Sequence, residues 1–489
     1  MMERVWLGCA AMVMGCGSGP VVQVDPTALT SPLAQNITIS QIAMLQALEV
    51  PVMQAGGVAD RGDIPLIALR DSILRVYVTP GNGFTPHQLT ARVRIVTSSP
   101  TGSSAEVFSA SAVVAGATVE NDLTTSLNIP IPGINIEMGS SISVVLNDTK
   151  GDPASIATST ARWPADGSLS DLGVAEGGDH LKVMIVPVQY EADGSGRLPD
   201  TSPAQMTAYA NRFYQLYPTA QVDMSIHDPW PYTGVITGDD VTGFEGCLMA
   251  LGQLRSMDQP DPDVYYYAAF EPASDFGTFC GGGCVAGLSG IGTPYSVGLG
   301  YTGSEGTAVH EVGHAHGRFH APCGGAANPD PAWPGPPIGT NPAYAKALIG
   351  VWGYDAINNV MIDPTMTVDM MSYCSPTWIS DFHYNLIFTR VQYDNQYYND
   401  WQAGTPTSRY SAAPVNAADP VRVSSTVTRE PWVAQGQPRP ATWSGGSATT
   451  YFFPYDHAPG GILYVPDSVP AKATIAGLRD TEATTTISR

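Results

Sequence analysis

The run His310-Glu-Val-Gly-His-Ala-His-Gly-Arg-Phe-His320 contains four of the nine histidines of the chain, at spacings that suit metal binding. Positions i and i+4 of an α-helix share one face, so His310 and His314 point two imidazoles to the same side. Glu311 follows the first of these residues and lies beside the ion without binding it, where a general base is needed. The spacing therefore predicts a helix that carries two metal ligands and a catalytic carboxylate.

The residues after the second histidine supply a third ligand. Glycine enters the left-handed backbone conformation without steric penalty, so we expect Gly317 to end the helix and His320 to return toward the ion. Three protein ligands leave one position on zinc for water, which is typical of a catalytic rather than a structural site. His316 lies six residues after His310 and projects from another face, so we interpret it as a non-ligand.

A second motif, Val368-Asp-Met-Met-Ser-Tyr-Cys374, follows downstream. The long histidine motif followed by this turn resembles the metzincin clan of zinc endopeptidases, over roughly residues 181–403. Within the clan, the chain looks most like secreted bacterial enzymes related to the proteases that cleave mucin-type glycoproteins. The resemblance implies that Met371 lies beneath the zinc-binding histidines. It also implies that Tyr373 lies near the metal, where its phenol either binds zinc at rest or hydrogen-bonds the oxyanion of the intermediate.

The composition narrows the class of protein. A chain of 489 residues is too long for one ordinary core, so about two to four domains are expected. Lys and Arg total 22 against 44 Asp and Glu, a net charge of −22, which argues against nucleic acid as a partner. The abundance of glycine and proline favours a loop-rich and strand-rich architecture.

The first residues are typical of an export signal. Residues 5–14 are apolar but too short to span a bilayer, and Val13-Met-Gly-Cys16 resembles a lipobox, in which Cys16 is lipidated. An ordinary signal peptide cleaved nearby, or a start codon placed elsewhere, are the alternatives. We predict a leader over residues 1–16 and a tether over 17–35, with any membrane attachment through Cys16. The protein is then exported, to the bacterial cell envelope or the extracellular space.

The remaining cysteines fit an oxidising compartment. Cys323 closely follows the third histidine and Cys374 closes the second motif, so a bridge between them would join the two segments around the metal. Cys280 and Cys284 either close a tight loop with each other or one of them pairs with Cys247. Spacing alone does not decide this connectivity.

The order of elements predicts an α+β chain of three domains. Residues 36–165 show short alternating strands and indicate an immunoglobulin-like β-sandwich, which serves as a spacer, an adhesive module or a pro-domain over the cleft. Strands and helices alternate in 181–403, which predicts a metzincin-like catalytic domain with a twisted, mostly parallel sheet and the zinc helix. Residues 404–489 indicate a small β domain.

Two further expectations concern single elements. Residues 295–301 are predicted to be an edge strand that leads into the zinc helix and aligns an extended substrate by strand addition. The histidines outside the motif are assigned surface or core roles, and they are His87, His180, His227, His383 and His457.

The sequence therefore predicts an exported endopeptidase with one catalytic zinc, which acts on extracellular proteins or glycoproteins. A catalytically silent surface binding protein on the same scaffold is the alternative from another class. A zinc hydrolase that acts on a non-peptide bond is the third. Digestion of peptides separates the first hypothesis from the others.

Overall fold

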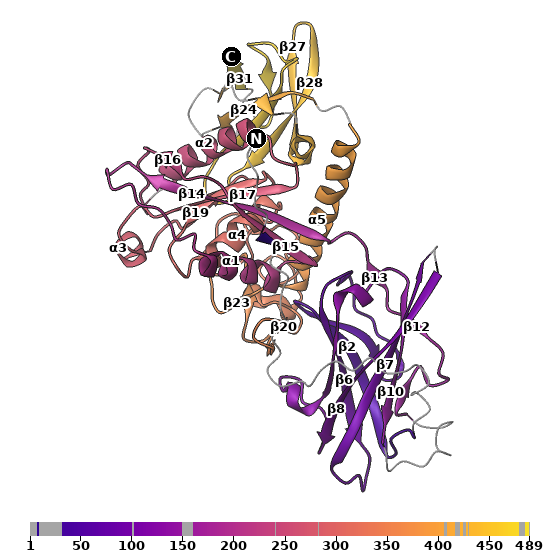
Figure 1. Cartoon of the computed structure of the whole chain (residues 1–489). Coiled ribbons are helices and arrows are strands. Elements are labelled where there is room, and N and C mark those ends of the chain that lie inside the picture. The colour runs from indigo at the N-terminus through magenta and orange to yellow at the C-terminus, as the bar shows by residue number, and fades with distance from the viewer. Residues whose placement is uncertain are drawn as a thin grey trace.

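The protein has an α+β fold with several separate sheets, seen in the computed structural model as three successive regions (Figure 1). Apart from Leu7 and Gly8, the predicted leader lies outside the described residues, as do Cys16 and most of the tether. The structure describes residues 7–8, 32–99, 102–148, 160–239, 241–281, 283–404, 408–415, 421–423, 427–428, 430–478 and 485–488. No helix in these ranges is long and apolar enough to cross a membrane.

A mainly parallel sheet forms the central region. Its strands in spatial order are β1 (Leu7–Gly8), β15 (Gln221–Ile226), β14 (His180–Tyr190), β17 (Val264–Phe270), β19 (Tyr295–Leu299) and β18 (Gly287–Ser289), and β16 (Trp230–Tyr232) also pairs with β14. The pairs from β15 to β19 are parallel, whereas β18 runs antiparallel to β19. This arrangement agrees with the mostly parallel sheet that the sequence predicts.

Helices cover both faces of this sheet, because successive strand residues point to opposite sides. Val183 and Ile185 of β14 join one hydrophobic cluster with α1 and α4, while Met184 and Val186 join another with α2. The helices of this region are α1 (Pro203–Leu216), α2 (Thr242–Asp258), α3 (Phe276–Cys280), α4 (Glu305–Ala315) and α5 (Asp381–Gln402). Figure 1 shows α2 on the side of the sheet opposite α1 and α4.

The prediction of an edge strand at residues 295–301 is wrong. Strand β19 is completely buried and has a hydrogen-bonded partner on each side, β17 and β18. The outermost strand on this side is β18. It has only three residues, so the sequence does not show that a strand follows the glycine-rich loop. Strand β18, and not β19, therefore ends the described sheet on this side.

Two antiparallel sheets make up the N-terminal region. One contains β4 (Gly57–Val58), β3 (Glu49–Gln54), β2 (Ile37–Leu45), β6 (Ser72–Pro80) and β9 (Leu127–Ile131). The other contains β11 (Arg162–Trp163), β10 (Ser140–Asn147), β7 (His87–Ser99), β8 (Gly102–Val114) and β12 (Ser170–Asp171), and two short helical turns lie at Leu123–Thr125 and Gly133–Asn135. Both sheets contribute to one hydrophobic cluster, as expected for a sandwich.

The N-terminal region is held to the central region by buried contacts. The guanidinium of Arg70 donates to the backbone oxygens of Tyr214, Tyr217 and Thr219 at 2.5, 2.7 and 2.7 Å. Strand β13 (Val174–Ala175) pairs in parallel with β5 (Leu66–Ile67) where the chain passes between the regions. Because charged groups are buried only when they are well partnered, these contacts mark a fixed junction.

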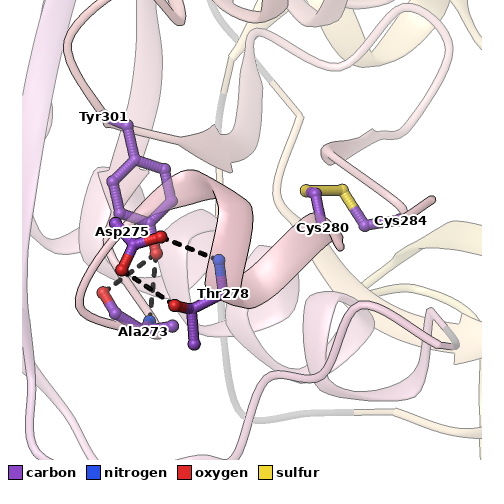
Figure 2. The surroundings of a disulfide bond; sticks show 6 residues. All are labelled: Ala273, Asp275, Thr278, Cys280, Cys284 and Tyr301. Atoms are coloured by element: carbon purple, nitrogen blue, oxygen red, sulfur yellow. Dashed lines mark hydrogen bonds between the residues drawn. A yellow bond between two sulfur atoms is a disulfide. The ribbon is translucent and has the colours of Figure 1, made fainter. Parts of the chain in front are cut away.

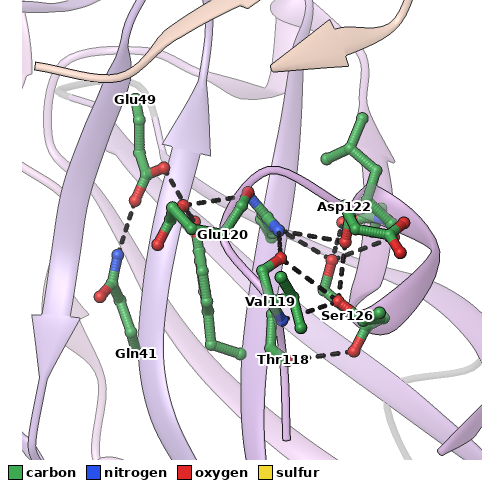
Figure 3. Close-up of polar contacts among 12 residues, drawn as sticks. Gln41, Glu49, Thr118, Val119, Glu120, Asp122 and Ser126 are labelled. Atoms are coloured by element: carbon green, nitrogen blue, oxygen red, sulfur yellow. Dashed lines mark hydrogen bonds and ion pairs between the residues drawn. The ribbon is translucent and has the colours of Figure 1, made fainter. Parts of the chain in front are cut away.

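The same N-terminal region contains a buried polar cluster (Figure 3). The hydroxyl of Tyr77 lies between two carboxylates, 2.8 Å from Glu49 and 2.6 Å from Glu120. Arg75 forms an ion pair with Glu120 at 3.2 Å. Burial, and next the charge of Glu120, raises the pKa of Glu49 to about 8. The surroundings therefore favour the protonated form of the Glu49 carboxyl group.

The C-terminal region is a single eight-stranded sheet. In spatial order it contains β25 (Val421–Arg422), β31 (Thr485–Ser488), β30 (Thr474–Ile475), β27 (Gln437–Trp443), β28 (Gly446–Pro454), β29 (Gly461–Pro466), β24 (Tyr410–Val415) and β26 (Val427–Thr428). The hydroxyls of Tyr295 and Tyr464 are 2.7 Å apart, and Arg255 pairs with Glu430 across the same junction. This sheet therefore packs on the face of the central sheet that carries α2.

The chain between α4 and α5 contains little regular structure, as its prolines predict. It contains the 3-10 segment Pro342–Ala347 and the short strands β20 (Gly353–Asp355), β21 (Val360–Ile362), β22 (Val368–Asp369) and β23 (Thr377–Trp378). The second sequence motif begins with β22, and Met371 within it packs against Gly313 of α4.

Candidate metal centre

Helix α4 and the turn after it bring three imidazoles together. His310 and His314 lie on one face of α4, and Gly317 follows the helix with φ +85°, as predicted for a residue that ends it. The Nε2 atom of His314 lies 3.1 Å from Nε2 of His310 and 3.1 Å from Nε2 of His320. Two nitrogens bound to a tetrahedral zinc at about 2.0–2.1 Å lie about 3.3 Å apart, so the observed spacing fits such an ion.

Each imidazole is oriented by a backbone oxygen on its other nitrogen. The Nδ1 atoms of His310, His314 and His320 donate to the carbonyls of Met370, Arg318 and Ala327, respectively. These hydrogen bonds are 2.8, 2.6 and 2.5 Å long. A hydrogen bond of this kind fixes the tautomer and leaves Nε2 as the free lone pair for a metal.

The three imidazoles are held in their neutral form. Burial lowers the pKa of His310 to about 4 and that of His320 to about 3, and it lowers the pKa of His314 well below its ordinary value. A neutral imidazole is the form that binds a metal ion. The centre is therefore ready for a metal at neutral pH without first releasing protons.

The second motif lies directly beneath α4. Met371 is fully buried, and a Cβ atom on Gly313 would lie 2.5 Å from its sulfur. The methionine therefore packs so close to α4 that only glycine fits at position 313 without a shift. Asp369 anchors the turn, because its carboxylate accepts the Met371 N–H at 2.7 Å and contacts His383 Nδ1 at 2.8 Å. His383 on α5 thus has the structural role expected of it.

The structure contains the disulfide Cys323–Cys374, which confirms the bridge considered from the sequence. It joins the chain just after the third histidine to the end of the second motif. Two backbone hydrogen bonds run beside it, from Ala321 N to Met371 O at 2.9 Å and from Tyr373 N to Cys323 O at 3.2 Å. The disulfide therefore covalently links the segment that follows His320 to the second motif.

Glu311 lies beside the three histidines and is only 2% exposed. Its Oε2 atom has no hydrogen-bond partner among the described residues, and a Cβ on Gly287 of β18 would lie 2.4 Å from its Oε1. Burial, and next the carboxylate of Asp456, raises the pKa of Glu311 well above its ordinary value. A buried carboxyl group with a raised pKa is suited to proton transfer.

Tyr373 borders the same space and is 42% exposed. Its ring centroid lies 4.8 Å from that of His320 and 6.0 Å from that of His310. Burial, followed by the carboxylates of Asp456 and Glu311, raises the pKa of its phenol. The phenol thus stays protonated at neutral pH and is available as a hydrogen-bond donor.

Two residues at the centre were missed by sequence reasoning. Asp456 and His457 follow β28 in the C-terminal region, and their ligand atoms, with those of His314 and His320, all lie within 4.8 Å of one another. The surface or core role expected for His457 is therefore wrong. The only sequence signal for this position is that Asp456 and His457 are adjacent and are both residue types that bind metals. No fixed spacing connects them to the motif around His310.

His316 does not join this group. Its ring stacks on Tyr265 at 4.0 Å and meets the edge of Tyr217 at 5.4 Å, and its Nδ1 contacts Val312 O at 2.7 Å. The position is completely buried on another face of α4. The placement agrees with its interpretation as a non-ligand.

A cleft of about 640 Å³ opens beside the centre. Its described lining comes from the central region, with His457 from the C-terminal region, and includes no residue of the N-terminal sheets. Residues 283–286 form one side, after the disulfide Cys280–Cys284 that closes the loop at the end of α3 (Figure 2). Because Cys280 pairs with Cys284, Cys247 is left as a free, buried thiol.

These observations define a buried His/Asp cluster that can hold a metal ion, at the head of a cleft. Comparison of the chain with family models, with curated proteins and with solved structures gave no match. The function must therefore be argued from the chemistry of this site. The donor set consists of imidazole nitrogens and a carboxylate oxygen, which suits zinc and other first-row transition metals.

Proposed function

We propose that the protein is an exported zinc-dependent endopeptidase that hydrolyses peptide bonds of extracellular proteins or glycoproteins. The observation that carries the proposal is the convergence of three neutral imidazoles beside the buried carboxyl group of Glu311, at the head of an open cleft. The metzincin-like motifs support the same assignment, as does the close packing of Met371 under α4.

His310, His314 and His320 would hold the zinc ion through their Nε2 atoms. When bound, zinc lowers the pKa of a coordinated water and polarises the carbonyl that is attacked. Their Nδ1 hydrogen bonds to backbone oxygens keep the rings from rotating. A site held in this way loses little free energy to reorganisation during the reaction.

Glu311 takes the proton of the attacking water and delivers it to the leaving amine. Its burial keeps the carboxyl group out of contact with bulk water, and the raised pKa makes it a stronger base than an exposed glutamate. Tyr373, which stays protonated, donates a hydrogen bond to the oxyanion that develops on the substrate.

The substrate runs beside β18. This strand ends the described sheet, and the residues that precede it line the cleft. An extended peptide that pairs with a free strand edge gains backbone hydrogen bonds whatever its side chains, which suits an enzyme that cleaves polypeptides. The two disulfides are compatible with export, and any lipid anchor at Cys16 would hold the enzyme at the cell surface.

Casein cleavage by the mature chain, with Glu311→Ala as the matched control, tests the proposal. We expect cleavage that a chelator abolishes and that added zinc restores, and no cleavage by the variant despite an unchanged zinc content. Cleavage by Glu311→Ala at the wild-type rate would exclude this site as the active centre.

A catalytically silent surface binding protein is the second candidate. The observation that favours it is Asp456, because a fourth protein ligand is typical of a structural zinc site. Such a protein would bind zinc with the same residues and cleave neither casein nor shorter peptides. A zinc hydrolase that acts on a non-peptide bond would give the same result with casein but would act on an ester substrate.

A further inference from the structure

We infer that Asp456 is a fourth metal ligand and that the segment Pro454–His457 occupies part of the substrate path, so that the C-terminal sheet keeps the centre closed. This inference rests on the proposed function, since it concerns the same metal. The segment Pro454–His457 lies far from the histidine motif in the sequence.

The position of the Asp456 carboxylate is the first argument. Asp456 is fully buried, and its Oδ2 lies 3.4 Å from Nε2 of His314. This separation matches the distance of about 3.3 Å between two ligand atoms of a tetrahedral zinc. This oxygen is therefore placed to bind the same ion as His314 and His320, whose ligand atoms lie within 4.8 Å of it.

Both oxygens of this carboxylate are held in place. The backbone N–H of Ser289 donates to Oδ1 at 3.0 Å, and Nδ1 of His457 donates to Oδ2. The amide of Asn328 also donates to the backbone oxygen of Asp456 at 3.2 Å. A ligand supported in this way keeps its orientation without a metal, as supported metal ligands generally do.

The backbone around Asp456 imitates a bound peptide. Ile291 N donates to Pro454 O at 2.8 Å, Asp456 N donates to Ser289 O at 3.2 Å, and Gly290 and Tyr455 form an antiparallel bridge. The segment thus adds to the chain that continues from β18, by the same backbone pairing that we propose for a substrate. A polypeptide cannot occupy this stretch while the segment remains there.

The C-terminal sheet is built to hold the segment. Phe453, just before it, packs 3.3 Å from the position of a Cβ on Gly292, and Ile462, after it, packs 3.4 Å from that of Gly290. The hydrogen bond between Tyr295 and Tyr464 and the ion pair of Arg255 with Glu430 fix the same junction. Displacing Asp456 therefore requires movement of the sheet and not of a loose turn.

The closure is partial. The cleft of about 640 Å³ remains open beside His310 and Glu311, and His457 forms part of its lining. Ligands can reach the centre from that side, whereas a chain that passes across the whole centre must first displace the segment. The closed centre should then bind metal tightly and cleave long substrates slowly.

The variant Asp456→Asn in the full mature chain tests this inference, with Asp467→Asn on the same sheet as the matched control. Asparagine keeps the shape and can accept the Ser289 N–H, but it is a poor zinc ligand. We expect the visible spectrum of the cobalt-substituted protein to change in Asp456→Asn only. We also expect zinc affinity to fall by about tenfold or more and casein cleavage to rise, with faster amide exchange over residues 287–291.

The spectrum and the cleavage assay separate the two proposals. An identical cobalt spectrum and zinc affinity in wild type and Asp456→Asn would overturn the inference, even if casein is cleaved. A changed spectrum with no cleavage by either protein would support Asp456 as a ligand and count against the endopeptidase. Should Asp456→Asn not fold, Asp456→Glu, which keeps the carboxylate at a greater length, must also shift the spectrum, and an unshifted spectrum would overturn the inference.

Discussion

The contact between Gly313 and Met371 predicts that one methyl group added to the zinc helix destabilises the protein. A Cβ on Gly313 would lie 2.5 Å from the sulfur of Met371 and 3.2 Å from its terminal carbon, with the Tyr217 hydroxyl at 3.6 Å. Carbon and sulfur atoms in contact normally lie near 4 Å, so the methionine or the helix must move by about 1.5 Å. Met371 is fully buried, so it can move only if its neighbours move with it.

The magnitude follows from two opposing effects. Replacing glycine by alanine inside a helix stabilises it by about 1 kcal/mol. Overpacking of a buried position costs about 1–3 kcal/mol, and the adaptable thioether favours the lower part of this range. Gly313→Ala should therefore lower the free energy of unfolding by about 0–2 kcal/mol, and it should weaken zinc binding because His314 is the next residue.

Helix α4 offers a matched control in Gly306. A Cβ on Gly306 would meet no atom within 4 Å, so Gly306→Ala gains helix propensity without a clash. Because this position lies in the first turn, we expect a stabilisation of about 0.5–1 kcal/mol. Calorimetry of both variants in metal-free buffer, with zinc titration afterwards, measures the difference. If Gly313→Ala proved as stabilising as Gly306→Ala, the packing of the methionine beneath the zinc helix would be refuted.

Three further predictions follow from the site and from the polar cluster of the N-terminal region. Glu311→Gln should retain one zinc per chain and lower kcat by about 10²- to 10⁴-fold. Loss of the bound zinc from this variant would indicate that Glu311 is a metal ligand and not a base. Cys374→Ser opens a loop with a sequence separation of 51 residues from Cys323; we expect a loss of about 4 kcal/mol, measured by denaturant titration, whereas an unchanged midpoint would argue against the bridge. The folded-state pKa of Glu49 is raised from 4.5 to about 8, so its contribution to stability is complete below pH 4.5 and is lost as the pH rises through 8. Relative to wild type, the free energy of unfolding of Glu49→Gln should therefore rise between pH 5 and pH 8, by up to about 1.4 kcal/mol per pH unit. Melting curves at several pH values measure this difference, and parallel pH profiles of the two proteins would contradict the raised pKa.

The parts of the site that were predictable from the sequence depend on local spacing. The interval between His310 and His314 is set by the helical repeat, and Gly317 identifies itself by the backbone angle that only glycine adopts readily. The position of the Met371 turn could be anticipated because the motif as a whole resembles a known one. The alternation of strands and helices likewise predicted the parallel sheet.

The parts that were not predictable depend on contacts between distant segments. Asp456 lies beside the histidines only because the C-terminal sheet packs on the central one, and no periodicity in the sequence encodes that junction. The assignment of the outer strand failed for a similar reason. Strands β18 and β19 are both buried and apolar, so only their hydrogen-bond partners show that β18 lies at the edge.

The zinc content of the purified mature chain, measured beside His320→Ala, tests the central claim most directly. His320 approaches the other two histidines from the turn after the helix, so its loss removes one ligand while α4 keeps its length. The account predicts one zinc per chain in wild type and a loss of tightly bound zinc in the variant. Absence of zinc from wild type, or equal zinc in both proteins, would contradict it.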